Sequence, residues 1–599
     1  MRQIWMYMKN YKKETVLAPL FKMLEACFEL CVPLVIASLT DVGIRNGDKG
    51  YAVKMGLVLL LLAAVGFGCS VVAQFFSARA AVGVATKLRH NLFKHIESFS
   101  FTEIDKVGTS TLITRMTSDV NQVQSGVNMM LRLFLRSPFI VFGAMIMAFT
   151  IDVKSALIFV VTIIVLLIVV FAIILYTIPM YKRVQSALDR VLGITRENLA
   201  GARVIRAFGM EDDEIEEYDN RTSLLFKLQV GVGRISALMN PVTLFIINGA
   251  TIILVWTGAI QVNDGKLSQG EVIALVNYMS QILVELVKLA NLIVTLTKAV
   301  ACGNRIEGIF DIKSSLELKE VLGEDVKSNQ EASYVIEYDN VSIKYQGSPE
   351  ESMKDVTFKI KKGETVGIIG GTGSGKSTLI QAIPRFYDVS EGSIKVNGKD
   401  VRDYSLEDLR SRIAVVLQKA VLFKGTIREN LLWGKEDATE AEIYEALDRA
   451  QAREFVDKKE NGIEEMIEQG GRNLSGGQRQ RLTIARALIR KPEILILDDS
   501  SSALDYATDS KLRQAIKEMS EQNDTTVIIV SQRATSIMHA DKIVVLDDGE
   551  VAGMGTHNEL LENNQVYKEI YMSQNSIKGN YSSEGTAIKS SYSCEATGI

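Results

Sequence analysis

The most chemically specific stretch of the chain is a glycine-rich run between an apolar segment, 365–369, and a helical pattern, 379–386. Phosphates are held best where backbone N–H donors converge and no Cβ blocks their approach, so this order predicts a P-loop rather than an ordinary glycine-rich turn. Lys376 should reach the β- and γ-phosphates, and the Ser377 hydroxyl should coordinate Mg²⁺. The residues expected to bind nucleotide here are Gly370, Gly371, Thr372, Gly373, Ser374, Gly375, Lys376, Ser377 and Thr378.

A second motif has the form of a buried strand that ends in a carboxylate. Residues 494–497 are all Ile or Leu, and Asp498 follows them directly. This is the pattern of a Walker B motif, whose carboxylate would share a Mg²⁺ ion with Ser377. ATP and Mg²⁺ are therefore the expected cofactors.

Length and composition indicate more than one domain and a membrane. The chain has 599 residues with a net charge of −4, and its long apolar runs all lie before about Gly303. We find no basic stripe with interleaved aromatic residues, which makes nucleic acid an improbable partner. Five cysteines in so long a chain do not form a disulfide framework, and no cysteine or histidine cluster has metal-ligand spacing.

Six apolar segments are each close to or above the roughly 20 residues that cross a bilayer. The connections after the second and fourth segments are long and rich in Lys and Arg, so both should lie in the cytoplasm together with both chain ends. The long connections read as helices, which extends the spans into the cytosol. The segments are Val16–Val42, Val53–Phe76, Met130–Thr150, Ala156–Ile178, Pro241–Ile260 and Val272–Thr297.

Charged residues inside the apolar segments are few, and each is a candidate for function. Glu25 and Glu29 share one helix face, and a carboxylate pair facing a cavity would favour an amphipathic cation as substrate. In the alternative interpretation, Glu285 pairs with Lys288 one turn away, and Glu25 and Glu29 lie at the interface or on cytosolic extensions.

A third motif is more selective than the first two. Residues 474–481 read Leu-Ser-Gly-Gly-Gln-Arg-Gln-Arg and precede a helical stretch. With six spans ahead of one nucleotide-binding domain, the chain resembles the half-transporters of the ATP-binding cassette (ABC) exporter family from the surface helix to about residue 574. It resembles in particular the degenerate subunit of heterodimeric bacterial multidrug exporters.

The resemblance implies further roles. Tyr345 matches the aromatic residue that stacks on adenine, and Gln418 matches the glutamine that senses Mg²⁺. Ser475 and Gly477 match signature residues that approach the γ-phosphate bound by the opposite cassette. The remaining matches are the interface loop Ser501–Asp505, a weakly matching acidic loop at Glu468 and Gln469, and two coupling helices at Gly108–Asp119 and Glu197–Glu211.

Two positions depart from the family pattern at the expected catalytic site. Asp499 stands where a glutamate usually polarises the attacking water, and Gln532 stands where a histidine usually contacts the γ-phosphate. Loss of a well-placed base costs about 10²- to 10⁴-fold in rate, so this site should bind ATP and hydrolyse it poorly. Because its signature is intact, the chain should complete the competent site of a different partner in a heterodimer. Steric compensation that keeps this site active is the alternative.

The expected fold is multidomain, with an all-α six-helix transmembrane domain followed by an α/β P-loop domain with a helical subdomain. The expected function is ATP-driven export of hydrophobic or amphipathic compounds across the cytoplasmic membrane, in contact with its lipids. A homodimeric exporter or lipid flippase and an ATP-binding sensor subunit are the alternatives. The expected segments are a surface helix (1–14), the transmembrane domain (15–310), a linker (311–332), the cassette (333–574) and a disordered tail (575–599).

Overall fold

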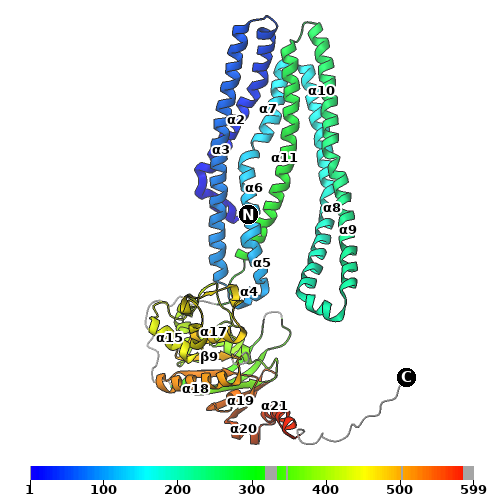
Figure 1. The fold of residues 1–599 in the computed structure, drawn as a ribbon. Coiled ribbons are helices and arrows are strands. Elements are labelled where there is room, and N and C mark those ends of the chain that lie inside the picture. Colours follow the sequence, from blue (N-terminus) through cyan, green and yellow to red (C-terminus); the bar gives the residue numbers. More distant parts are fainter. Residues whose placement is uncertain (1, 317–332, 346–347, 501–503, 584–599) are drawn as a thin grey trace, which may run out of the picture. The chain divides into compact units, whose positions relative to one another are not determined.

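The computed structural model describes residues 2–316, 333–345, 348–500 and 504–583. It divides into two compact units, one of Met1–Glu97 with Thr109–Ile312 and one that joins Ser98–Gly108 to the chain from Lys313 onward. Figure 1 shows long helices in the first unit and mixed strands and short helices in the second.

The first unit is entirely helical (Figure 1). Two of the spans have clear local signals. Ser268 and Glu271 form a capping box at the start of the last helix, and Gly209, at φ 64°, ends the longest one. The helices are α1 (Arg2–Met8), α2 (Lys12–Ser38), α3 (Lys49–Glu97), α5 (Thr109–Thr114), α6 (Val120–Leu133), α7 (Arg136–Ile151), α8 (Val153–Phe208), α9 (Glu211–Ala237), α10 (Met239–Asn263) and α11 (Gln269–Phe310).

Within the described residues, six helical stretches are long and apolar enough to cross a membrane, and each contains one of the six predicted segments. The prediction of six spans is therefore confirmed. The expected helical extensions are also present, since α3 continues to Glu97 and α8 continues to Phe208. The second expected coupling element, Glu197–Glu211, covers the end of α8 and the turn at Gly209; its role remains a prediction.

The core of this unit is built from closely packed helices with small residues at their contacts. Ala26, Ala144 and Ala156 are fully buried there, and small side chains let helix backbones approach closely. The Tyr278 hydroxyl on α11 donates a 2.6 Å hydrogen bond to the Leu30 carbonyl on α2. This bond ties the first span to the last.

The first expected coupling element, Gly108–Asp119, lies almost entirely in the helical unit, and its role remains a prediction. A seven-residue helix, α4 (Phe101–Val107), belongs to the cassette unit, whereas the residues from Thr109 belong to the helical unit. Asp119 is buried there, accepting a 2.6 Å bond from Arg305 on α11, so it faces its own helices. Gly108, at φ 80°, ends α4, and the helical unit resumes at the next residue, Thr109.

The second unit is organised around two sheets and a short ribbon, β7 (Gly425–Thr426) with β8 (Met466–Ile467). The antiparallel sheet has the order β2 (Met353–Lys361), β1 (Tyr334–Ile343), β4 (Glu391–Val396) and β5 (Lys399–Asp400). The larger sheet, parallel except at β12, has the order β12 (Glu550–Gly555), β11 (Lys542–Asp547), β3 (Thr365–Gly370), β10 (Thr526–Val530), β9 (Ile494–Asp498) and β6 (Ile413–Val416).

Helices cover this sheet, and the carboxyl ends of β3 and β9 meet at one edge because their neighbour β10 runs parallel to both. The expected P-loop and Walker B residues are thereby brought together. The helices are α12 (Lys376–Ala382), α13 (Leu406–Arg412), α14 (Ile427–Leu432), α15 (Glu440–Arg449), α16 (Arg453–Asp457), α17 (Gly476–Leu488), α18 (Tyr506–Asn523), α19 (Ala534–Ile537), α20 (His557–Asn563) and α21 (Gln565–Ser583).

Part of the predicted disordered tail, 575–599, is helical, because α21 continues to Ser583. The helix is anchored earlier by Tyr567, which is buried and bonded to His557 Nδ1 at 2.7 Å, and elongation from an anchored turn adds one hydrogen bond per residue. Residues 584–599 lie outside the described residues. So do 317–332 of the predicted linker.

Candidate nucleotide-binding site

The P-loop forms at the junction of β3 and α12, where the sequence predicts it. Gly373 and Gly375 have φ values of 87° and 88°, which L side chains rarely adopt, so these turns require glycine. A Cβ on Gly375 would also approach the Ser352 carbonyl oxygen to 2.8 Å. The result is an open main-chain cradle at the N-terminus of α12, as phosphate binding requires.

Lys376 opens α12 and is mostly buried. Its Nζ donates to the Gly370 carbonyl at 3.0 Å and to the Ser374 hydroxyl at 3.2 Å, as well as to the Gly371 carbonyl. Burial lowers its pKa, and the Asp499 and Asp498 carboxylates oppose that shift. The ammonium group thus lies over the loop that would hold the phosphates.

The expected Mg²⁺ ligands are in contact. Ser377 Oγ donates to Asp498 Oδ1 at 3.2 Å, and β9 buries every residue up to Asp498. Burial and repulsion from Asp499 raise the pKa of Asp498, while the Ser377 bond lowers it. A hydroxyl and a carboxylate are hard oxygen ligands that suit Mg²⁺. Among the described residues, no group of three His, Cys, Asp or Glu side chains is placed to hold a metal ion.

Asp499 is held by its own backbone and by two neighbours. It has φ 44°, and its N–H donates to the Val530 carbonyl at 2.9 Å. Its carboxylate accepts hydrogen bonds from the Gln418 side chain and from the Gln532 N–H. Burial raises the pKa of Asp499, although the positive charges of Arg533 and Lys376 and these hydrogen bonds oppose the shift.

The Gln532 segment is anchored from the C-terminal helix. Gln574 Nε2 donates to the Gln532 carbonyl at 2.7 Å, and Gln574 Oε1 accepts from the Ala534 N–H at 2.9 Å. The backbone around the position of the missing histidine is therefore fixed. No sequence motif marks Gln574, because its partners are main-chain atoms about 40 residues away.

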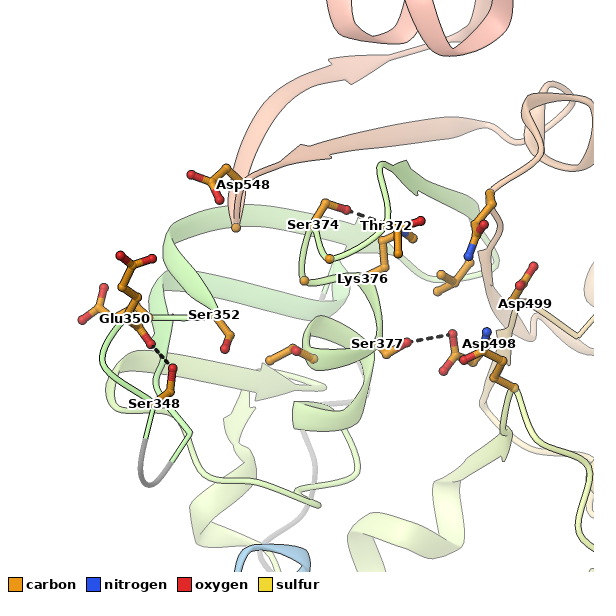
Figure 2. Close-up of a pocket in the computed structure, with 18 residues that line it drawn as sticks. Ser348, Glu350, Ser352, Thr372, Ser374, Lys376, Ser377, Asp498, Asp499 and Asp548 are labelled. Atoms are coloured by element: carbon orange, nitrogen blue, oxygen red, sulfur yellow. Dashed lines mark hydrogen bonds between the residues drawn. The ribbon is translucent and has the colours of Figure 1, made fainter. Parts of the chain in front are cut away.

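These groups surround one cavity of about 500 Å³ (Figure 2). Thr372 through Thr378, Gln418, Asp498, Asp499 and Gln532 line it as predicted. The side chains of Glu350, Glu351 and Asp548 line it as well, and sequence reasoning missed them because they lie on turns between strands. The expected nucleotide residues thus converge on a space large enough for a small ligand.

Several expected residues lie apart from this cavity lining. Gly370 and Gly371 contact Lys376 Nζ through their carbonyls. Tyr345 is bonded to the P-loop through its hydroxyl, which donates to Thr378 Oγ1 at 3.0 Å. Ser475 caps α17 by accepting from the Gln478 N–H at 3.3 Å, and it is exposed, as expected of a group presented to another molecule. Gly477 lies in the first turn of the same helix.

The structure describes all of the expected acidic loop and part of the expected interface loop. Glu468 and Gln469 are exposed after β8, and the Glu468 N–H donates to Asn473 Oδ1 at 3.1 Å. In the expected interface loop, residues 501–503 lie outside the described residues. Asp505 caps α18 by accepting from the Thr508 N–H at 3.0 Å.

Comparison with known proteins identifies the two units. Residues 15–286 match the ABC transporter transmembrane region, and residues 353–502 match the ABC transporter domain. An uncharacterized ABC transporter ATP-binding protein of Bacillus subtilis, YfiB, is 36% identical over 97% of this chain and 100% of its own length. The chain belongs to the ABC transporter family. It is an exporter half-transporter, with a membrane domain and one ATP-binding domain.

Two further relatives carry functional names. The putative multidrug export ATP-binding/permease protein YgaD of Bacillus subtilis is 32% identical over 96% of this chain and 99% of its own length. The ATP-dependent lipid A-core flippase of Vibrio parahaemolyticus is 28% identical over 96% of this chain and 97% of its own length. The fold matches a bacterial Atm1-family ABC exporter solved with ATP bound, with a TM-score of 0.77 at 22% identity over 94% of this chain and 98% of the other.

The half-transporter is therefore a multi-pass membrane protein that binds ATP and couples its hydrolysis to transport. The predicted fold class is confirmed, with six apolar helices followed by an α/β cassette.

In the membrane unit, both carboxylates of the expected pair, Glu25 and Glu29, have a basic partner, and Glu29 lines a cavity. Glu25 accepts from Lys22 at 2.6 Å, and Glu29 accepts from Arg136 at 2.6 Å. Arg136 also pairs with Glu285 at 2.6 Å, and both side chains are buried. The sequence did not show this because Arg136 comes from a third span, more than 100 residues from either carboxylate.

The alternative interpretation of Glu285 is confirmed in part. Lys288 Nζ lies 2.8 Å from Glu285 Oε1, one turn along α11. The cluster thus holds three carboxylates and three basic groups. Buried charges are tolerated in a membrane span when they are paired in this way.

Proposed function

We propose that this chain is one half of a heterodimeric exporter that moves hydrophobic or amphipathic compounds out across the cytoplasmic membrane. Its own ATP site binds Mg²⁺–ATP and hydrolyses it slowly, while Ser475 and Gly477 complete the hydrolytic site of a non-identical partner. The Lys- and Arg-rich long connections support a cytoplasmic cassette and cytoplasmic termini.

The observation that carries this proposal is the way Asp499 is held. Its side chain is one methylene shorter than glutamate, a deficit of roughly 1.5 Å. The main chain is restrained from advancing to compensate, because the Asp499 N–H is bonded to the Val530 carbonyl at 2.9 Å. A base that does not reach its water forfeits about 10²- to 10⁴-fold in rate.

The glutamine at position 532, where the family usually has histidine, should also lower the rate of ATP hydrolysis. Gln532 can donate a hydrogen bond to a phosphate but carries no positive charge. The binding elements, by contrast, are complete, since Lys376, Ser377 and Asp498 are assembled around the cavity. Binding without efficient turnover follows from this combination.

The proposed substrate class no longer includes a preference for cations. Each acidic side chain in the membrane cluster has a basic partner, so the cluster offers no net negative charge. A cavity of about 280 Å³ between α2 and α11 is lined by Glu29 and Glu285 together with amide, hydroxyl and apolar side chains. A mixed lining of this kind supports amphipathic molecules with hydrogen-bonding groups.

The test is ATP turnover by the full chain purified alone in lipid, with ATP binding measured on the same sample. We expect tight binding with turnover close to background. Turnover that Asp499→Asn abolishes would contradict the proposal, because it would show that the aspartate works as the base. Loss of binding in Lys376→Ala is the control that binding occurs at this P-loop.

A homodimeric lipid flippase is the second candidate, favoured by the full-length similarity to lipid A-core flippases. Its signature residues would complete two identical sites. In that case the chain alone would hydrolyse ATP and move a labelled lipid between leaflets of a proteoliposome. The proposed heterodimer predicts neither activity until a second half-transporter is supplied.

A further inference from the structure

A set of aromatic residues connects the short helix α4 to the nucleotide site, and all of them lie in the cassette unit. The Tyr387 hydroxyl donates a 2.7 Å hydrogen bond to Asp105 Oδ2 on α4. The Tyr387 ring meets the Tyr345 ring at 89°, with centroids 5.0 Å apart. Edge-to-face contact of this kind is a favourable arrangement of two aromatic rings.

Tyr345 is therefore located by two contacts at different points of its side chain. Its hydroxyl is fixed to Thr378, in the first turn of α12, and its ring is fixed by Tyr387. If either contact were lost, the ring could turn about its χ angles, because a partly exposed side chain has room to do so.

Tyr387 is itself in a rigid setting. Arg385 is buried and paired with Asp388 at 2.7 Å, and Arg410 donates to the Arg385 carbonyl at 3.2 Å. Phe101 on α4 packs on Phe386 with centroids 4.8 Å apart. The backbone that carries Tyr387 is thus held on both sides. Tyr387 meets α4 through its ring, whose centroid lies 6.1 Å from that of Phe101, and through its hydroxyl, which is the part that Tyr387→Phe removes.

α4 is also held by hydrogen bonds that do not involve Tyr387. Glu103 Oε1 accepts from the Ser315 N–H at 3.2 Å, and Ser100 Oγ lies 2.9 Å from Ser315 Oγ. Burial raises the pKa of the Tyr387 hydroxyl, and its bond to Asp105 raises it further, so it stays a donor throughout the physiological range. The carboxylate of Asp105 is a strong acceptor for that donor.

We propose that Tyr387 is a positioning residue for Tyr345, with Asp105 of α4 holding the Tyr387 hydroxyl so that the Tyr345 ring is ready to stack on an adenine base. This inference rests on the proposed role of Tyr345 in adenine binding. It makes affinity for the base, as distinct from the phosphates, depend on where α4 lies. By reciprocity, adenine binding favours the hydrogen bond between Tyr387 and Asp105.

The test compares the affinities of the full-length chain in lipid for Mg²⁺–ATP and for Mg²⁺–tripolyphosphate, which has no base. We expect Tyr387→Phe and Asp105→Ala each to weaken ATP binding roughly three- to tenfold, because only the part of the hydrogen bond that is coupled to the position of the Tyr345 ring is felt by the base. Tripolyphosphate binding should be unchanged. The double variant should be no weaker than the worse single variant, because both remove one interaction.

Two controls separate positioning from folding. Asp105→Asn keeps an acceptor oxygen and should retain ATP affinity within about twofold of the wild type. Tyr404→Phe removes a comparable hydroxyl, bonded to the Val396 carbonyl at 2.8 Å within the cassette, and should change neither affinity.

The outcomes distinguish this inference from the proposed function. If Tyr345→Ala weakens ATP binding but Tyr387→Phe does not, the positioning role is overturned and the proposed function stands. Equal losses for ATP and tripolyphosphate in Tyr387→Phe also overturn it, because the effect would then lie in the phosphate cradle. If Tyr345→Ala leaves ATP affinity intact while Lys376→Ala abolishes it, the adenine role of Tyr345 is wrong and the inference falls with it.

Discussion

Asp499 and Gln532 carry the mechanism at the scale of single residues. Asp499 stands in place of the usual glutamate and is one methylene shorter. Gln532 stands in place of the usual histidine and carries no charge, although it can still form hydrogen bonds. Around them the binding residues are intact, with Lys376 over the P-loop and Ser377 bonded to Asp498. In the proposed mechanism, a site without the usual glutamate and histidine but with its binding groups in place holds ATP and turns it over slowly.

Restoring the two residues should restore hydrolysis. We expect Asp499→Glu with Gln532→His to raise ATP turnover of the chain alone by roughly 10²-fold, because the intact signature of a second copy can then complete each site. Phosphate release measured in lipid tests this. The same double variant carrying Lys376→Ala should be inactive. No gain in turnover, with ATP binding preserved, would mean that residues outside this pair block catalysis.

Glu103 gives a pH-dependent prediction. Burial raises its pKa, but hydrogen bonds from Ser100 and Ser315 outweigh this and lower the pKa below its usual 4.5. A depressed carboxylate pKa stabilises the fold above the unfolded-state pKa, and this stabilisation is lost as the pH falls through the folded-state pKa. Glu103→Gln should therefore lower the melting temperature at pH 7.

The difference between wild type and Glu103→Gln should shrink as the pH falls below about 4.5, the ordinary value. Thermal melts from pH 7 to pH 3.5 check this. Glu454→Gln is a control for an exposed carboxylate whose pKa is also lowered, by its pair with Lys458, and we expect the change in melting temperature there to be small at every pH. A difference that stays constant with pH would contradict the assignment of the effect to the ionised carboxylate.

At the scale of elements, the paired charges of Arg136 join three spans. Arg136 on α7 contacts Glu29 on α2 and Glu285 on α11, so one guanidinium links helices that are distant in sequence. Arginine suits this role because its planar fork binds two carboxylates at once. The cluster therefore contributes to the packing of the helices as well as to the lining of the cavity between α2 and α11.

Removing that guanidinium should be costly. Arg136→Gln leaves the buried Glu285 with Lys288 and the Ser137 hydroxyl, and breaking a buried pair costs about 3–5 kcal/mol. We expect a clearly lowered melting temperature in detergent. Arg221→Gln breaks an exposed pair with Glu217 and should cost less than about 1 kcal/mol. Equal melting temperatures for the two variants would mean that the buried network does not support the fold.

At the scale of the whole molecule, membrane orientation is the open prediction. The Lys- and Arg-rich connections should be cytoplasmic, which puts the short turn after α10 outside. In a cysteine-free background, an impermeant maleimide should label Asp264→Cys in intact cells. Lys458→Cys in the cassette should react only after the membrane is opened. The reverse pattern would overturn the orientation.

Much of this could be predicted from local sequence. The lengths of the apolar segments fix six spans, because a helix must satisfy its backbone hydrogen bonds across the bilayer. The P-loop and Walker B residues could be found because glycine and a strand-terminal carboxylate have few other uses at that spacing. The departures at Asp499 and Gln532 were also visible, since they are single substitutions within recognisable motifs.

Other features depended on contacts between distant parts of the chain. The partners of Glu29 and Glu285 come from another span, and α4 belongs to the cassette although it follows a membrane helix. The anchoring of Asp499 by Gln418, and the link from Asp105 to Tyr345, likewise join segments far apart in sequence. Periodicity and motif spacing indicate which helix, strand or loop a residue belongs to. The pairing of charges and rings across elements is decided only when the chain packs.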